Sequence, residues 1–577
     1  MKFKFGMTIH ELKKRTDRKY YRGVRFLGGA AKEVKKLKKH DHLVLMHLVR
    51  AANYLEVVNL KLENSNNMEF LKFLNEEIEK RNPKAILAKR LFESQKSMYS
   101  PDALGNQTSL VKDMPQPDGL GYFPNDLETK EFHRILNEML DANKNDEVAK
   151  ILNQRTIVVR DGKFLKAIDF VDAFPELQLM AKELRMAKEQ SKDKVFNEYL
   201  ELQAQALETA DPMLDAKADK VWATLSADTK YEFTICRECY DEKLTKSIYE
   251  NQELMQKLKN ANITVFAKDN LGARVGIVNK KGTEFLNKLK SLIDISAKFM
   301  PYKDEYTFEK QTEEIPQTAV DVDVITLTGE EGAYRASLVL AQNLPNDDKL
   351  ALQIGGGRRN VYHRQVRLGG NKKRFKKLIS DEQFKYFNPE ADHWAVICHE
   401  NTHSLGPKSH NSLGKFSAIL EEFKADMGMY AFLSEFVEAG YFTEEQRKQI
   451  ILTSLTYSFL KGKPTLAQAH RTRSVMIVNR MIQEKAITFD EQGKFVFDFD
   501  KAEQTAKTMM AEVIRLQIDQ DVKKAEAYVN KWFVWTDEID AVAKKLQKMS
   551  KMLNGYLIQP LADEMLRFDY EQKVLAK

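Results

Sequence analysis

The chain has 577 residues, of which 43% are hydrophobic and 30% charged. This balance is typical of globular proteins and allows two or three domains with sizeable cores. The net charge of +7 is a small basic excess and gives no reason to expect nucleic acid as a partner.

Cysteine content and the N-terminus bear on location. Three cysteines (Cys236, Cys239 and Cys398) are too few for a disulfide framework and favour a reducing compartment, so we expect a cytoplasmic protein. The basic N-terminus lacks the apolar core of a signal peptide, and a leader removed earlier is left open. Residues 43–49 are apolar but too short to span a bilayer, so no membrane partner is expected.

The first half of the chain is mostly helical in pattern. Helical spacing of apolar residues runs through 42–60, and a segment rich in Pro and Gly at 100–126 predicts a break. Residues 127–232 are again helical, apart from a hairpin expected at 156–165 around Asp161 and Gly162. Cys236 and Cys239 form a C-x-x-C pair without further ligands at suitable spacing, so we interpret them as structural.

The strongest strand signals lie between 263 and 340. They are I-T-V-F-A, A-R-V-G-I-V, V-D-V-I-T-L and R-A-S-L-V-L, and they predict a small β core. G-G-G-R-R at 355–359 lacks the G-K-[ST] ending of a phosphate loop. The nine Lys and Arg residues from Arg358 to Lys377 either hold a substrate carboxylate or form a solvated surface, and both interpretations stay open.

An H-E-x-x-H motif follows an apolar run that begins at Trp394. Its histidines, His399 and His403, are spaced i and i+4, so on a helix both imidazoles reach one metal ion. Glu400 is placed next to the first histidine, where its carboxylate can take a proton from water at the metal. The alternative to a metal site is a surface helix with two unrelated histidines.

A third ligand is expected at Glu422. Eighteen residues separate it from His403, which fits a turn at Gly406-Pro407 and a returning helix. Two His and one Glu leave zinc an open position, as a catalytic site requires. Glu421 and Asp426 are on or near the same face, where they could hold the imidazoles. Beyond this motif, residues 445–577 are almost entirely helical in pattern, with a turn at 489–495.

Six motifs in order resemble the dipeptidyl-peptidase III family of zinc peptidases, especially its shorter bacterial members. They are G-Y-F-P-N-D-L-E-T-K-E-F at 121–132, R-E-C-Y-D-E at 237–242, N-L-P-N-D-D at 343–348, the metal motif with E-E-F-K-A-D at 421–426, A-H-R-T-R at 469–473, and L-I-Q-P at 557–560. The motif H-E-N-T-H has five residues, whereas the longer members have six, so an ordinary helix is expected here. Arg473 is also shifted relative to the family's Arg.

The resemblance implies a role for each matching residue. One Zn²⁺ per chain would be bound by His399, His403 and Glu422, with Glu400 as general base and Glu421 and Asp426 supporting the imidazoles. Tyr240 and His470 would stabilise the oxyanion. Glu238, Asn343 and Asn346 would hold the free α-amino group of an oligopeptide substrate.

The resemblance also implies an α+β fold, mostly helical, with two lobes around a wide cleft. We expect a mixed α/β lobe over 1–283, a helical-lobe segment over 284–325, a return to the mixed lobe over 326–380, and a helical zinc-binding lobe over 381–577. Closure of the lobes on peptide would bring Tyr240 to the scissile carbonyl.

The predicted function is therefore a zinc-dependent exopeptidase that releases dipeptides from the N-terminus of oligopeptides. One alternative is a single-residue aminopeptidase or another small-substrate zinc hydrolase on the same fold. A second, of a different class, is an inactive zinc-containing peptide-binding protein. The sequence leaves side-chain preference and oligomeric state open, as well as cobalt or manganese in place of zinc.

Overall fold

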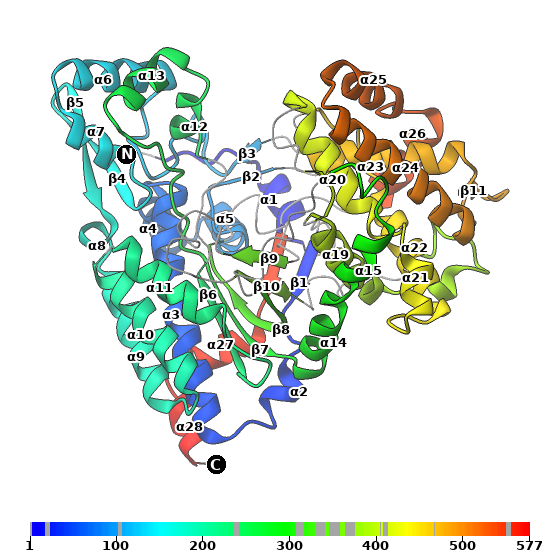
Figure 1. Ribbon diagram of the computed structural model, residues 1–577. Coiled ribbons are helices and arrows are strands. Elements are labelled where there is room, and N and C mark those ends of the chain that lie inside the picture. The colour runs from blue at the N-terminus through cyan, green and yellow to red at the C-terminus, as the bar shows by residue number, and fades with distance from the viewer. Residues whose placement is uncertain are drawn as a thin grey trace.

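The computed structural model describes residues 3–17, 23–101, 107–209, 211–235, 242–306, 317–329, 341–344, 358–363, 375–403, 405–407, 413–466, 468–549 and 555–576. The fold is α+β and mostly helical, as predicted. Figure 1 shows the N-terminal helices on one side, the helices of residues 389–549 on the other, and the largest sheet between them.

The largest sheet has five strands in the order β6-β7-β8-β10-β9. These are β6 (Tyr231–Ile235), β7 (Ala273–Val278), β8 (Gln317–Leu327), β9 (Ala341–Leu344) and β10 (Arg358–His363). β8 and β10 run parallel, and the other pairs are antiparallel. Every residue of β7 is buried, including Arg274, so the strand is covered on both faces.

The strand predictions for this sheet have mixed outcomes. The strands at 273–278 and 322–327 are confirmed. The prediction for 263–267 is wrong, because these residues form a connection whose Phe266 amide donates to Leu152 O. R-A-S-L-V-L at 335–340 lies outside the described residues.

The longest helix of the N-terminal half is α3 (Lys39–Glu63), and α4 and α9 pack against it. The others are α1 (Ile9–Thr16), α2 (Ala31–Val34), α4 (Asn67–Glu79), α5 (Pro83–Gln95), α6 (Thr129–Asp141), α7 (Asn145–Ile151), α8 (Phe170–Ala173), α9 (Glu176–Gln190), α10 (Lys194–Thr209), α11 (Pro212–Trp222), α12 (Leu244–Ile248) and α13 (Gln252–Asn260). Within the described ranges, α3 is the one helix that is long and apolar enough to cross a membrane. The sequence analysis had considered only residues 43–49 and judged them too short. Since 78% of the apolar window of α3 is buried under helices such as α9, α3 is a core helix.

Short hairpins flank these helices. The predicted hairpin is confirmed as β4 (Thr156–Asp161) paired with β5 (Phe164–Asp169), and Gly162 in its turn has φ +59°. A second joins β2 (Tyr99–Pro101) to β3 (Gln107–Ser109). The turn expected at 489–495 connects β11 (Ile487–Phe489) to β12 (Phe495–Phe497).

The helical half contains α19 (Pro389–His403), α20 (Ser417–Met427), α21 (Leu433–Glu438), α22 (Glu444–Ser458), α23 (Ala469–Gln483), α24 (Phe499–Asp519), α25 (Val522–Trp532) and α26 (Asp537–Met549). Two 3₁₀ turns, Phe384–Tyr386 and Gly414–Phe416, precede α19 and α20. The apolar faces of helices α19 to α26 form one large buried cluster, which is distinct from the cluster around α3.

The two clusters meet at α14 (Lys280–Lys290), which leads into α15 (Leu292–Phe299). At its start, Asn279 donates from Nδ2 to Asp321 of β8 at 2.9 Å, and Thr283 accepts from the Asp321 amide. Leu286 and Leu289 of the same helix are buried in the second cluster. Helix α14 therefore connects the sheet to the helical half.

The C-terminal segment returns to the first half of the chain. Strand β13 (Gly555–Ile558) pairs in parallel with β1 (Gly23–Phe26). The helices α27 (Pro560–Met565) and α28 (Tyr570–Ala576) follow, and both pack against α3. These residues share a cluster with the N-terminal helices, whereas the predicted lobe boundaries placed all of 381–577 together. Where the lobes divide therefore stays a prediction.

Candidate metal centre

Helices α19 and α20 form the predicted helix–turn–helix. α19 is a continuous α-helix through His403, so both motif histidines project from one face. Gly406 has φ +87°, a left-handed conformation that glycine adopts without strain, and it occupies the expected turn. The two helices approach closely, because a Cβ at Gly428 would lie 1.8 Å from Thr402 Oγ1.

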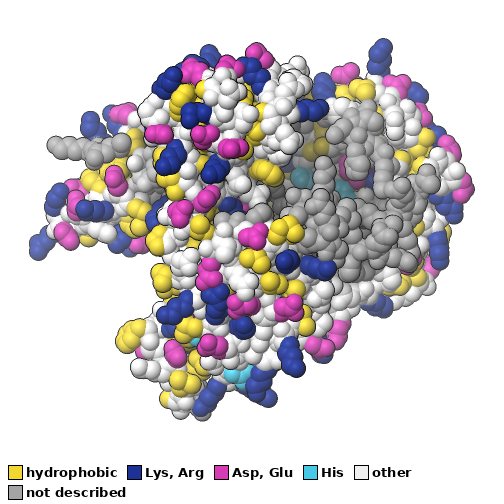
Figure 2. Space-filling model, turned by 60° about the vertical axis from the view of Figure 1, so that its left-hand side comes forward, with side chains coloured by type: hydrophobic (Ala, Val, Ile, Leu, Met, Phe, Trp, Pro, Cys, Tyr) yellow, Lys and Arg dark blue, Asp and Glu magenta, His cyan; other side chains and the backbone are white. Residues whose placement is uncertain are grey.

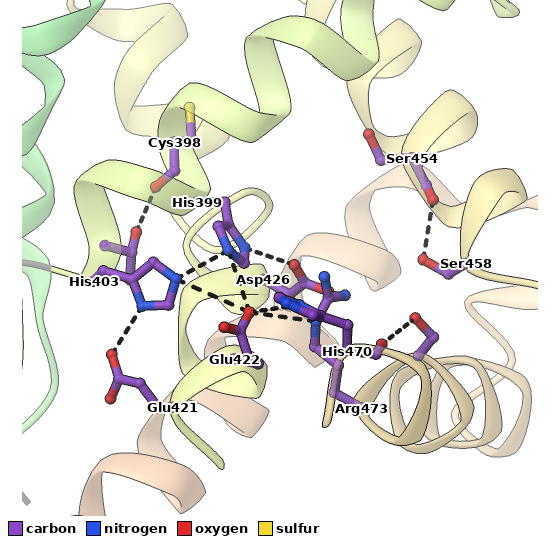
Figure 3. A network of polar contacts seen from close by, with 12 residues as sticks. Cys398, His399, His403, Glu421, Glu422, Asp426, Ser454, Ser458, His470 and Arg473 are labelled. Atoms are coloured by element: carbon purple, nitrogen blue, oxygen red, sulfur yellow. Dashed lines mark hydrogen bonds and ion pairs between the residues drawn. The ribbon is translucent and has the colours of Figure 1, made fainter. Parts of the chain in front are cut away.

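Three ligand atoms converge between the helices (Figure 3). His399 Nε2 and His403 Nε2 are 3.0 Å apart, and Glu422 Oε2 lies 3.4 Å from the first and 4.0 Å from the second. With bonds of 2.0–2.2 Å, two ligand atoms of a tetrahedral zinc are separated by roughly 3.3 Å. The three atoms therefore match the spacing of a zinc ligand set, and they all lie within 4.8 Å of one another.

The other face of each imidazole is held by a carboxylate. His399 Nδ1 lies 2.8 Å from Asp426 Oδ1, and His403 Nδ1 lies 3.0 Å from Glu421 Oε1. An ionised carboxylate only accepts, so each Nδ1 carries the hydrogen and each Nε2 presents a lone pair. Two lone pairs facing each other at 3.0 Å repel unless a cation lies between them. The donor set therefore fits a zinc ion.

Carboxylates at the centre stay ionised. Burial alone would raise the pKa of Glu422, but hydrogen bonds from the His399 and His470 rings, when these carry a proton, lower it well below its ordinary value. Burial likewise opposes ionisation of Glu421, but the hydrogen bond from His403 and the charge of Lys424 lower its pKa to about 2. Both side chains are therefore anionic at neutral pH, as ligation and imidazole support require.

Two further residues border the cluster. His470, in the first turn of α23, contacts Glu422 Oε2 through Nδ1 at 2.9 Å, while 70% of its side chain is exposed. That hydrogen bond raises the pKa of His470 against the lowering effect of burial, and the charges of Glu422 and Glu400 act in the same raising direction. Glu400 is partly exposed, and its carboxylate forms no hydrogen bond or ion pair within the described residues. Figure 2 shows histidine side chains inside a hollow of the surface.

Several contacts at this centre were missed by the sequence reasoning. Arg473 of α23 pairs with Asp426 through Nη1, and its Nε lies 3.9 Å from Glu422 Oε2. Lys424, which is 2% exposed, donates to Glu421 Oε1 at 2.9 Å and to Leu405 O at 2.6 Å. The i, i+3 spacing of Glu421 and Lys424 could have predicted their pair.

In the basic segment from Arg358 to Lys377, Lys376 and Lys377 are exposed, as a solvated surface requires, whereas Arg359 is buried. Arg359 is 1% exposed, donates to Glu232 Oε2 at 3.1 Å, and lies over the Trp222 ring. Arg359 therefore forms part of the buried core. The sequence analysis had considered only a substrate-carboxylate site or a solvated surface for this segment. Cys398 is a buried free thiol whose pKa is raised by burial to about 12, which fits an inert role.

The remaining site residues from the sequence analysis are not placed in the same way. Glu238, Tyr240 and Asn346 lie outside the described residues, as do Cys236 and Cys239. Asn343 belongs to β9, where its backbone pairs with Asn360 of β10. The positions of these side chains relative to the metal cluster stay a prediction.

Solved structures of similar shape cover nearly the whole chain. The structure of DPP III from Caldithrix abyssi is 22% identical with a TM-score of 0.79, over 96% of this chain and 100% of that one. Dipeptidyl-peptidase III from Corallococcus sp. strain EGB is 18% identical with a TM-score of 0.70, over 99% and 100%. The chain therefore has the dipeptidyl-peptidase III fold, which confirms the predicted resemblance at the level of the fold.

A curated relative matches part of the chain. Nudix hydrolase 3 from Arabidopsis thaliana is 23% identical over 308 residues, which are 51% of this chain and 39% of that protein. The match therefore spans about two fifths of the relative's length. No protein-family profile matches the chain.

Proposed function

We propose that the protein is a zinc-dependent exopeptidase that releases dipeptides from the free N-terminus of oligopeptides. The observation that carries this proposal is the convergence of His399 Nε2, His403 Nε2 and Glu422 Oε2, with Glu400 next to the first ligand. The dipeptidyl-peptidase III fold supports the peptidase class. The zinc, when bound, supplies a Lewis acid that polarises the scissile carbonyl and acidifies water.

The side chains around this cluster divide the remaining work. Glu400, with a carboxylate that has no partner among the described residues, takes a proton from the attacking water and passes it to the leaving amine. His470 is exposed beside Glu422, where an imidazole N–H can donate to the carbonyl oxygen as charge develops there.

Substrate register is assigned from the resemblance. Glu238, Asn343 and Asn346 hold the substrate's α-amino group, since a carboxylate and two amide oxygens suit an ammonium ion. Tyr240 supplies a second donor to the oxyanion. These groups belong to the mixed half of the chain and the metal to the helical half, so we propose that closure of the two halves completes the site. Unchanged small-angle scattering on inhibitor binding would argue against closure.

Location and partners follow the same proposal. We propose that the protein acts on oligopeptides in the cytoplasm, a reducing compartment that the low cysteine content favours. No role for nucleic acid or membrane is proposed.

The test is hydrolysis of a diarginyl arylamide beside a single-arginyl arylamide by the purified protein, with and without a chelator. We expect chelator-sensitive release from the dipeptidyl substrate only, with activity restored by Zn²⁺. Metal content measured on the same sample ties turnover to the ion.

Other outcomes separate the alternatives. Release from the single-arginyl substrate only would mean a single-residue aminopeptidase, with an amine pocket placed nearer the metal. Zinc binding without release from either substrate, but with peptide binding, would mean an inactive peptide-binding protein.

A further inference from the structure

The start of α23 meets α20 through charged side chains. On α23, His470 and Arg473 are three residues apart and face the same side. On α20, Glu422 and Asp426 are four residues apart and also share a side. His470 contacts Glu422, and Arg473 contacts both carboxylates, so the contact is a two-by-two pairing (Figure 3).

The two cations of α23 are buried to different extents. The His470 side chain is 70% exposed and has a single polar contact in the described part of the chain, at 2.9 Å. The Arg473 side chain is 14% exposed and lies against Asp426, which is 1% exposed. An exposed ion pair contributes little to holding a helix, whereas a buried pair is strongly favoured over either partner alone. The firmer attachment is therefore the one through Arg473.

The N-terminal end of α23 is an unfavourable position for cations. The N-terminus of a helix carries partial positive charge, so His470 and Arg473 in the first turns of α23 are disfavoured without anionic partners. The Arg473 side chain is 14% exposed and its nearest carboxylates are Asp426 and Glu422. Its placement therefore depends on the carboxylates of α20.

We infer that Arg473 is a positioning residue that anchors the first turn of α23 on Asp426 and thereby holds His470 beside the ligand cluster. The catalytic part of this inference rests on the proposed function, because it takes His470 as the donor to the oxyanion. The anchoring itself concerns only this chain's own residues.

The anchoring is tested first in the metal-free protein, by NMR of selectively ¹⁵N-labelled histidine rings. The signal of His470 is assigned by its loss in His470→Gln. Arg473→Met is expected to move that signal away from its wild-type position, because the ring loses its fixed place at Glu422. Arg471→Met is the matched control: Arg471 is on the same helix, is exposed, and contacts only Gln468 Oε1 and Gly462 O in the described residues.

Kinetics then test the consequence for turnover, on samples of equal zinc content. Removing one oxyanion donor typically lowers kcat by about 10²–10³-fold. We expect Arg473→Met to approach the loss seen in His470→Gln at similar KM, and the double variant to be no slower than His470→Gln alone. Arg473→Lys keeps the charge but not the planar fork, so it should restore part of both the signal and kcat.

An unmoved His470 signal in Arg473→Met, or losses in the two single variants that multiply in the double variant, would overturn the inference. Where Arg473→Met does not fold, Arg473→Lys decides, with a wild-type His470 signal and wild-type kcat counting against anchoring. Absence of turnover in the wild type would instead remove the proposed function, and the NMR comparison would still decide the anchoring.

Discussion

Buried arginines in the two halves of the molecule face carboxylates in different settings. In the N-terminal half, Arg155 donates from Nε to Asp269 at 2.8 Å and pairs with Asp215 through Nη2. In the helical half, Arg473 faces Asp426 and Glu422. Around Arg155 the named contacts join a donor to an acceptor. Beyond Asp426, however, the ring of His399 turns a lone pair toward that of His403 and toward Glu422.

This difference separates a structural cluster from a functional one made of the same residue types. A cluster in which donors meet acceptors is electrostatically complete and only stabilises the fold. A cluster in which acceptors face one another is unstable without a cation among them, so its geometry fits a site for a metal ion. Changes in the first should therefore affect stability alone, and changes in the second should affect metal binding or turnover.

The largest effect is expected from Glu400→Gln. The amide keeps the shape of the side chain but cannot accept the proton of the attacking water, so kcat should fall by at least about 10²–10⁴-fold. Zinc content should be unchanged, because Glu400 is not among the three convergent atoms. Metal analysis and arylamide hydrolysis on one preparation check both statements. Glu422→Ala is the comparison, since it should lose zinc. Near-normal turnover in Glu400→Gln would remove this residue from the mechanism.

Arg155→Met should affect the other cluster. It leaves Asp215 and Asp269, both nearly buried, without their shared cation. Removing one partner of a buried ionic cluster destabilises a protein by about 3–5 kcal/mol. Denaturant unfolding should show this loss, while the zinc affinity of the folded protein stays at the wild-type value.

The matched control for Arg155 is Arg160→Met. Arg160 also contacts two carboxylates, Asp126 and Glu131, but at the surface, so its loss should cost no more than about 1 kcal/mol. Equal destabilisation by the two substitutions, or weaker zinc binding in Arg155→Met, would contradict the separation of the clusters.

Gly428→Ala tests how closely the metal helices must approach. A methyl group at this position would overlap Oγ1 of Thr402 and also its Cβ, at 2.6 Å, so rotating Thr402 cannot relieve the overlap and α20 must move away from α19. Overpacking of this kind costs about 1–3 kcal/mol, and the shift should also weaken zinc binding by displacing Glu422. Thr402→Ala in the same chain should restore only part of both properties, because its Cβ still lies 2.6 Å from the added methyl group. Gly462→Ala, where a methyl group meets nothing within 4 Å, is the control.

Local patterns in the sequence predicted the parts of the site that lie close along the chain. The i, i+4 spacing of His399 and His403, the turn at Gly406 and the return of Glu422 depend on two neighbouring helices, and periodicity determines those. The hairpin at Asp161 and Gly162 was predicted for the same reason.

Contacts from distant segments could not be predicted in this way. Arg473 reaches Asp426 from α23, and Gln517 Nε2 reaches Glu421 Oε2 at 3.1 Å from α24, because tertiary packing brings three helices together. Pairing of β13 with β1 joins the two ends of the chain, and no local pattern encodes it. The wrong strand at 263–267 shows the same limit, since apolar alternation there serves burial in a connection.

The smallest effect on stability is expected from Glu201→Gln, a change in a charge network near the surface. Burial and charge pairing shift the pKa of Glu201 in opposite directions, so this change shows which of the two is stronger. Glu201 of α10 accepts from Lys188 at 2.9 Å and from Gln205 at 3.1 Å, with Arg185 at 3.3 Å. Burial would raise the pKa of Glu201, but these hydrogen bonds and the charge of Arg185 lower it to about 2. Since its side chain is 26% exposed, Glu201→Gln should cost about 1 kcal/mol or less at pH 7.

The pH dependence of this stability difference shows whether Glu201 is ionised in the folded protein. A carboxylate whose pKa is lowered in the folded state contributes stability above its unfolded pKa, near 4.5, and loses it as the pH falls toward 2. The difference in unfolding free energy between wild type and Glu201→Gln should therefore be constant from pH 6 to 8 and shrink below about pH 4.5. Glu198→Gln, an exposed position on the same helix, should show no such trend. A difference that grows on acidification would mean that Glu201 is protonated in the folded protein, and burial would then outweigh pairing even at this surface.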